Sequence, residues 1–255
     1  RSEPGLEGIT IMPGLLDKPN MLGRELIPVD RITPDYSIIN KCTNAYLEYE
    51  YEVQNAYITS TTKGCVRKCD FCAVSILEPK YCEYLDIKRQ IEEINTLYGE
   101  KRDLMLMDNN ILASSKLSEI VDDLVSLGFE RNNKSYKKIQ GKRVVYQTRR
   151  VDFNQGIDAR LLTEDKMAQL ARLEIQPLRI AFDHADEENV KIYINAQKLA
   201  AKYKIKNLSN YILFNFNDTP KELYDRLKIN IELNEEFNSL GLDTSIWSFP
   251  MKYMP

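Results

Sequence analysis

The sequence lacks several features that would place it in a common class of protein. No apolar run approaches the roughly 18–20 residues that span a bilayer, and no basic segment followed by an apolar stretch marks a secretory signal. No repeat with a period of about 20 to 50 residues is present. The formal net charge of -3 gives no general attraction to nucleic acid. We therefore expect no membrane association and no export, and we place the chain in the cytoplasm.

Histidine is nearly absent, and the cysteine count is odd. His184 is the single histidine, and three of the five cysteines lie close together. Such crowded thiols do not suit an ordered disulfide framework, whereas metal binding in a reducing compartment does. The chain opens on Arg1 rather than on methionine, and we expect it to be a piece of a longer protein.

The clustered cysteines form the most informative motif. Cys65, Cys69 and Cys72 are separated by three residues and then by two, and Phe71 precedes the last of them. This spacing suits a chain that wraps around a metal–sulfur cluster, and three thiolates leave one corner of a four-iron cluster without a protein ligand. Gly64 would let the backbone approach the cluster closely.

Zinc is the alternative occupant of this motif. Arg67 and Lys68 stand beside the thiols and favour their ionised form, which either metal needs. A structural zinc site takes four protein ligands, so the fourth would have to be His184, Cys42 or Cys82.

The chain divides into an irregular extension at 1–55, broken by five prolines, and a main domain at 56–255. Apolar runs in the main domain predict strands at about 56–60, 104–108, 151–158, 178–183, 211–215 and 244–249. Helical periodicity and caps predict intervening helices at 86–98, at Leu117 to Leu124, after Thr163, around Val190 to Gln197 and from Thr219. Six strands alternating with five helices predict an α/β fold, a partial (β/α)6 barrel of the TIM type. Its functional loops would follow the carboxyl ends of the strands.

A basic insertion interrupts this rhythm at residues 129–150. It holds eight lysines and arginines against Glu130 alone, a charge of +7 that leaves -10 on the rest of the chain. With Tyr136 and Tyr146 among the cations, it is a candidate RNA-binding segment. The alternative is a solvated loop without a partner.

The cysteine motif resembles the signature of the radical S-adenosylmethionine (radical SAM) superfamily. The approach to it, Thr61 to Cys65, is similar to that of the branch containing methylthiotransferases and cobalamin-associated enzymes. Residues 211–223 are similar to that branch's fifth strand and following helix, although Asn215 and Asn217 depart from its glycine-rich turn. The resemblance implies an oxygen-sensitive enzyme with a 4Fe-4S cluster on Cys65, Cys69 and Cys72. It would cleave S-adenosyl-L-methionine reductively to a 5′-deoxyadenosyl radical that acts on an unidentified substrate.

The same resemblance assigns cofactor-binding roles beyond the cysteines. Phe71 would lie beside the adenine, and polar residues after the strands would contact the amino group, ribose and carboxylate. These candidates are Asp108, Asn109, Asn110, Gln155, Asp158, Arg160, Asp183 and Asn215. The alternatives are helix caps at the first three positions and a structural ion pair between Asp158 and Arg160. His184 is either a proton donor or a structural residue.

Several functions remain open at this point. The resemblance implies an electron donor such as flavodoxin or ferredoxin, and the basic insertion suggests an RNA-modifying radical enzyme. A methylthiotransferase would need a second cluster, yet only Cys42 and Cys82 lie outside the motif, and we expect both to be buried small residues. A zinc-stabilised nucleic-acid-binding module without catalysis is the alternative from a different class.

Overall fold

The computed structural model describes residues 32–38 and 55–254. The chain separates into two units, Arg1–Asp35 and Tyr36–Pro255, and the helices and strands below all belong to the second. The expected irregular extension at 1–55, with Cys42, falls mostly outside the described residues. The predicted domain boundary at residue 56 therefore stays a prediction.

Six parallel strands form the framework of the second unit. They are β1 (Ala56–Thr59), β2 (Asp103–Leu106), β5 (Val151–Phe153), β6 (Leu178–Ala181), β7 (Asn207–Phe214) and β8 (Ser245–Lys252). Hydrogen bonds join them as two three-stranded sheets, β1-β2-β5 and β6-β7-β8. An isolated parallel bridge between Ile157 and Ile180 connects the turn after β5 to β6.

The strands therefore follow one another in chain order, as the alternation of strands and helices predicts. The α/β class is confirmed. Among the described residues no pairing joins β8 back to β1, so the sheet is open, and the predicted partial barrel of the TIM type is not shown.

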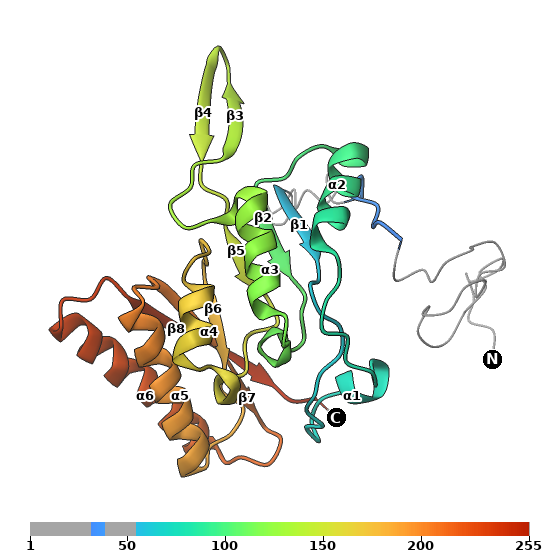
Figure 1. Cartoon of the computed structure of the whole chain (residues 1–255). Coiled ribbons are helices and arrows are strands. Elements are labelled where there is room, and N and C mark those ends of the chain that lie inside the picture. The colour runs from blue at the N-terminus through green and yellow to red at the C-terminus, as the bar shows by residue number, and fades with distance from the viewer. Residues whose placement is uncertain (1–31, 39–54, 255) are drawn as a thin grey trace, which may run out of the picture. The chain divides into compact units, whose positions relative to one another are not determined.

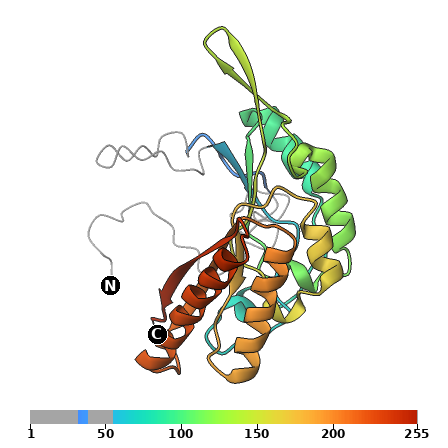
Figure 2. The ribbon, with the colours of Figure 1, turned by 90° about the vertical axis from the view of Figure 1, so that its left-hand side faces the viewer.

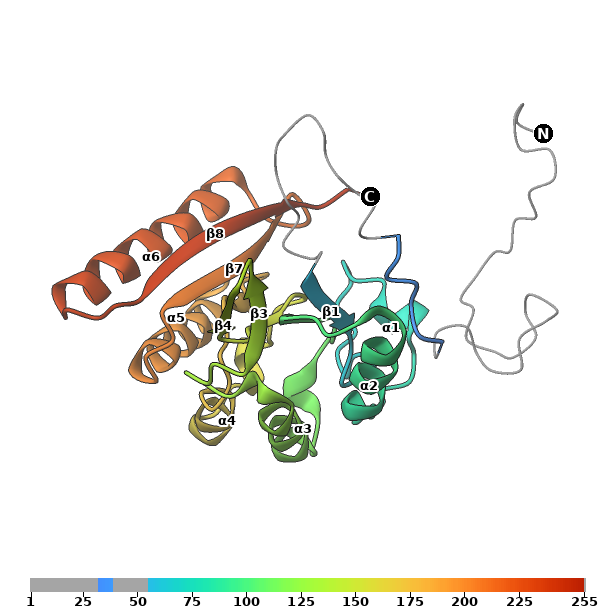
Figure 3. The same ribbon diagram turned by 90° about the horizontal axis from the view of Figure 1, so that it is seen from above.

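Five helices of seven or more residues alternate with these strands and lie along one side of them in chain order (Figure 3). They are α2 (Ile87–Tyr98), α3 (Leu117–Leu124), α4 (Glu164–Leu170), α5 (Glu187–Lys202) and α6 (Pro220–Ser239). The predicted caps are confirmed: Thr163 accepts from the Lys166 N–H, and Thr219 forms a capping box with Glu222. No helix in the described part of the chain combines the length and the apolar character that crossing a bilayer requires.

The core lies between the helices and one face of the sheet. Leu104 and Leu106 of β2 are buried, as are Leu178 and Ile180 of β6, whereas Arg179 between the latter two points to the opposite face and is less deeply buried. This alternation is the period of two that one covered sheet face imposes. Helices supply the matching stripes, for example Ile87, Ile91 and Ile94 of α2.

The basic insertion contains a hairpin that the sequence did not predict. Strands β3 (Tyr136–Gln140) and β4 (Arg143–Gln147) pair antiparallel and extend away from the other elements (Figures 1 and 2). Only Gly141 and Lys142 separate the two strands, and Gly141 has the positive φ of 59° that such a tight connection needs.

Candidate functional site

The cysteine loop lies between β1 and the short helix α1 (Val74–Leu77), at the carboxyl edge of the sheet. Cys65, Cys69 and Cys72 are free, partly exposed thiols, and the N–H of Cys72 donates to the carbonyl of Cys69 at 3.0 Å. The chain returns past this loop, and Lys63 and Cys82 exchange two backbone hydrogen bonds of 3.1 and 2.8 Å. Cys82 lies beside the loop and is half-buried, not fully buried as expected.

Gly64 allows the returning chain to pack against the cysteine loop. It has φ of +76°, and an added Cβ would lie 2.6 Å from the carbonyl oxygen of Lys80. Its N–H donates to Oε2 of Glu78 at 2.8 Å, and Nδ2 of Asn109 donates to the same oxygen at 2.8 Å. The backbone of residues 78–80 therefore passes too close to position 64 to leave room for any side chain there.

Asp108 fixes the start of the cysteine loop to the end of β2. The residue is 3 % exposed, and its carboxylate accepts hydrogen bonds from the backbone N–H groups and hydroxyls of Thr61 and Thr62. Burial raises the pKa of Asp108, and these hydrogen bonds act in the opposite direction. The geometry gives Asp108 a positioning role, and its contact with the cofactor's amino group stays a prediction.

Asp158 holds two arginines at the site. Its carboxylate is 3.1 Å from Nε of Arg67 and 2.7 Å from Nε of Arg160, so the expected ion pair with Arg160 is present and Arg67 joins it. Burial alone would raise the pKa of Asp158, but Arg160 and Arg67 outweigh it and lower the pKa below its ordinary value. Of the cations that the sequence placed beside the thiols, Arg67 is therefore paired with a carboxylate.

The environment of the thiols is set by residues from other elements. Burial raises the pKa of Cys69, and the charge of Arg160 partly offsets this effect. Nδ2 of Asn110 lies 3.6 Å from Sγ of Cys65 and 3.5 Å from Oδ2 of Asp158. Asn110 is 2 % exposed, and its Oδ1 has no hydrogen-bond partner among the described residues. A buried acceptor of this kind is costly unless a ligand or water satisfies it.

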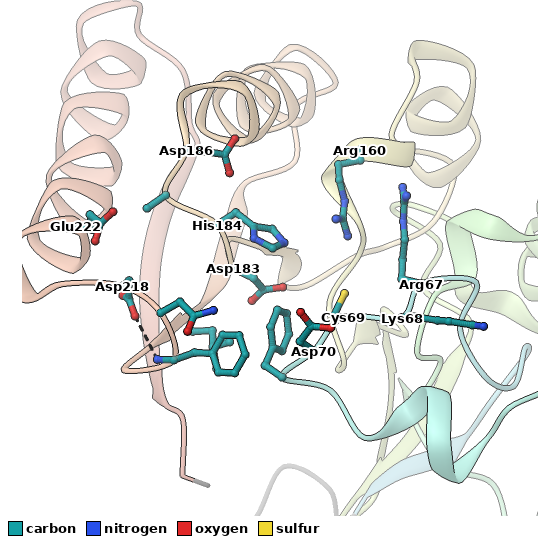
Figure 4. A pocket seen from close by; sticks show the side chains of 15 residues that line it. Arg67, Lys68, Cys69, Asp70, Arg160, Asp183, His184, Asp186, Asp218 and Glu222 are labelled. Carbon is teal, nitrogen blue, oxygen red and sulfur yellow. Dashed lines mark hydrogen bonds between the residues drawn. The ribbon is translucent and has the colours of Figure 1, made fainter.

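A cavity of about 450 Å³ opens beside the cysteine loop (Figure 4). Residues 67–71 and Arg160 line one side, and residues 183–186, 216–218 and Glu222, which follow β6 and β7, line the other. Cavities of this size hold small molecules. Its place at the carboxyl edge of parallel strands is where α/β folds bind ligands.

The two sides of the cavity carry opposite charge. Three cations, Arg67, Lys68 and Arg160, and one carboxylate, Asp70, lie on the cysteine side, whereas four carboxylates lie on the other: Asp183, Asp186, Asp218 and Glu222. Asp186 and Glu222 cap helices, and Asp218 pairs with Arg226. Asp183 has no hydrogen-bond partner among the described residues, and burial raises its pKa, although nearby cations oppose this.

Aromatic rings connect the two sides. The ring of Phe71 packs edge-on against Phe216 at 5.7 Å between centroids and lies 6.1 Å from the ring of His184. Phe216 in turn packs against Tyr253 at 4.8 Å. Figure 4 shows His184 directed toward the middle of the cavity.

The predicted site residues do not all reach this cavity. Cys69, Phe71, Arg160 and Asp183 line it, and the other two cysteines, Asp108 to Asn110 and Asp158 lie in the network just described. Gln155 is exposed in the turn after β5. Asn215 is exposed, has φ of 68° and donates to the carbonyl of Tyr253 at 3.3 Å. Neither lines the cavity, where Asn217 and Asp218 stand instead, and their cofactor roles stay predictions.

Arg226 is a site residue that the sequence analysis missed. It is 1 % exposed and donates to the carbonyl of Phe182, just after β6, at 3.0 Å and to that of Leu213, near the end of β7, at 2.9 Å, while it pairs with Asp218. A signal was present: Arg226 occupies the inward stripe of α6 that continues through Leu233 and Phe237. A basic residue in a core-facing register indicates a buried acceptor nearby.

The cysteine loop supplies the donor atoms that the implied cluster needs. Within residues 32–38 and 55–254, no group of three or more His, Cys, Asp or Glu side chains is gathered closely enough to hold a metal ion. The three thiols are nevertheless on one loop, partly exposed, and bordered by the unpaired acceptor of Asn110. Three thiolates on one loop are the ligand type that an iron–sulfur cluster takes, so these residues fit the cluster in kind. They do not form a tetrahedral zinc set with His184 or Cys82.

Comparisons with known proteins show the fold. No family model matches the chain, and no curated protein does. Among solved structures it is similar to HydG, a maturase of the [FeFe]-hydrogenase, with a TM-score of 0.51 and 14% sequence identity. The match covers 79% of this chain and 44% of that one, so the chain spans less than half of HydG. At this level of identity the likeness shows a shared fold alone, and it does not single out the methylthiotransferase branch.

Proposed function

We propose that this chain is a radical SAM enzyme that binds a 4Fe-4S cluster through Cys65, Cys69 and Cys72. The observation that carries the proposal is the position of the cysteine loop, which follows the first of six parallel strands and borders a cavity of about 450 Å³. The fold shared with HydG supports the same class. When bound, the cluster and S-adenosyl-L-methionine supply reductive cleavage of a carbon–sulfur bond, which yields a 5′-deoxyadenosyl radical.

The residues of the chain have distinct tasks in this proposal. Asp108 holds the cysteine loop in place, and Asp158 holds Arg160 where its charge faces Cys69 and the cavity. Arginine suits a carboxylate, so Arg160 is our candidate for the carboxylate end of the cofactor. The rings of Phe71 and Phe216 form an apolar wall that would exclude water and flank a planar base.

Two alternatives receive less support. A zinc-stabilised module needs a fourth ligand near the thiols, and the described residues do not assemble one. A methylthiotransferase needs a second cluster with its own cysteine ligands. Cys82 instead lies beside the first loop, where its thiol donates a hydrogen bond to the carbonyl of Tyr84 at 3.4 Å. The substrate, the reductant (flavodoxin or ferredoxin) and the cytoplasmic location stay predictions.

Anaerobic reconstitution with iron and sulfide tests the proposal. We expect a brown protein with about four irons per chain, which forms 5′-deoxyadenosine when supplied with reductant and S-adenosyl-L-methionine. Cys65→Ala, Cys69→Ala and Cys72→Ala should each lose both properties. Cys82→Ala is the matched control, because it removes a thiol next to the same loop and should retain both. A colourless protein that takes up zinc alone, or equal iron loss in Cys82→Ala, would contradict the proposal.

A further inference from the structure

The β3–β4 hairpin concentrates positive charge that the structure does not neutralise. Residues 131–150 contain eight lysines and arginines and no acidic residue. Arg131 donates to the carbonyls of Tyr203 and Lys204, and Arg149 pairs with Glu100, so these two tie the base of the hairpin to the body. Six exposed cations remain without an ion-pair partner among the described residues: Arg150, next to β5, and five on or just before the hairpin, Lys134, Lys137, Lys138, Lys142 and Arg143.

The strand register sorts the hairpin into two faces. Lys137 is opposite Tyr146 and Ile139 is opposite Val144, and cross-strand partners project from the same face. Ile139, Val144 and Tyr146 are 70%, 50% and 56% exposed. One face of the hairpin, which projects from the body in Figures 1 and 2, therefore displays a tyrosine ring and two aliphatic side chains beside a lysine.

The positive charge of the hairpin indicates a negatively charged partner. The rest of the chain is acidic, so the hairpin is the one strongly basic part of the described structure, and it faces solvent. Cations without partners attract phosphates, and an exposed tyrosine ring can stack on a base only where that base is unpaired. We propose that the β3–β4 hairpin binds single-stranded nucleic acid, with Tyr146 against a base and Lys137 beside it on a phosphate. Lys138 and Arg143, which project from the opposite face, contact further phosphates. This interface does not depend on the cluster or on radical chemistry.

Fluorescence anisotropy with a labelled 20-nucleotide single-stranded RNA tests the interface on the full chain. Each cation that contacts a phosphate contributes about -0.7 to the slope of log K against log salt, so five cations give a limit near -3.5. We then expect affinity to fall by up to about 100-fold between about 50 and 200 mM salt. DNA of the same sequence forms the second arm: tighter RNA binding assigns recognition to the ribose, and equal binding assigns it to base and phosphate alone. Both results support the proposal.

Variants separate the two kinds of contact. Replacing Lys137, Lys138 and Arg143 together by Gln should make the salt slope shallower by about 2 units. Tyr146→Ala should weaken binding by about 5- to 150-fold with the slope unchanged, and Tyr146→Phe should restore it. All four positions lie on the exposed hairpin, and circular dichroism checks that the body still folds.

The matched control removes three lysines from α5 and α6, at Lys191, Lys198 and Lys228, and should leave binding unchanged. The proposal is overturned if the hairpin variants bind as tightly as the wild-type chain. It is also overturned if a duplex RNA of equal length binds as well as the single strand, or if no RNA or DNA binds at the lower salt concentration.

Discussion

Replacement of Asp108 separates a positioning role from a ligand role. In Asp108→Ala the backbone N–H groups of Thr61 and Thr62 lose their acceptor, and both residues are buried, at 0% and 1% exposure. Each unsatisfied buried donor costs about 1–3 kcal/mol. Because removing the carboxylate also removes its own desolvation cost, we expect a loss of about 3 kcal/mol in the free energy of unfolding.

The smaller change Asp108→Asn refines this expectation. One oxygen, Oδ1, accepts hydrogen bonds from both threonine N–H groups and both hydroxyls. Asparagine keeps one such oxygen and loses only the charge, so the cost should fall to about 1 kcal/mol.

Urea unfolding of the metal-free protein at neutral pH, followed by circular dichroism, measures both losses. Asp186→Ala is the control, since it removes an exposed aspartate that caps α5 through the Asn189 N–H and should cost about 1 kcal/mol. A loss in Asp108→Ala no larger than in this control would refute the reasoning. The positioning role predicts the effect in the absence of any cofactor, which a pure ligand role does not.

Three further predictions concern the network around the cavity. Arg160 and Arg67 lower the folded-state pKa of Asp158, so the stability it adds is complete above its ordinary pKa and is lost as pH falls through the folded-state pKa; the gap in urea midpoint between wild type and Asp158→Asn should narrow on acidification from about pH 5 to below about pH 3, and a constant gap would contradict this. Gly64→Ala should lower the free energy of unfolding by more than Gly241→Ala, because both have positive φ but only Gly64 has a backbone oxygen 2.6 Å from the added Cβ; equal losses would count against the close approach. Arg226→Met should cost about 3 kcal/mol, because it leaves the partly buried carboxylate of Asp218 and the carbonyls of Phe182 and Leu213 without their donor, and Arg226→Lys should recover only part of it; full recovery in thermal unfolding would show that the planar guanidinium is not needed.

Local signals explain why most of the fold was predictable. The isoleucines on one face and Gly99 at the end predicted α2, and the capping box at Thr219 predicted the start of α6. Such signals depend only on residues that are close in the sequence. The β3 strand was missed because Tyr136 to Gln140 contains two adjacent lysines and a single aliphatic residue, so no alternation marks it. Whether the sheet closes depends on pairing between its distant ends, which no local pattern encodes.

The sequence predicted the parts of the site that lie close together along the chain, and missed contacts between distant residues. The cysteine spacing located the loop, but the pairing of Arg67 with Asp158 spans 91 positions and redirects a cation that sequence proximity assigned to the thiols. Asn215 follows a strand as expected, yet its backbone has φ of 68° and its side chain bonds Tyr253 instead of lining the cavity. The sequence shows which residues follow a strand and so lie at the carboxyl edge of the sheet. The backbone conformation at each of these residues then decides whether its side chain faces the cavity.

Electron paramagnetic resonance of the reduced, reconstituted protein tests the central assignment most directly. If Cys65, Cys69 and Cys72 supply all the protein ligands, one iron is open, and addition of S-adenosyl-L-methionine should change the spectrum of the cluster. A spectrum that S-adenosyl-L-methionine leaves unaltered, or no iron signal after reconstitution, would contradict the account.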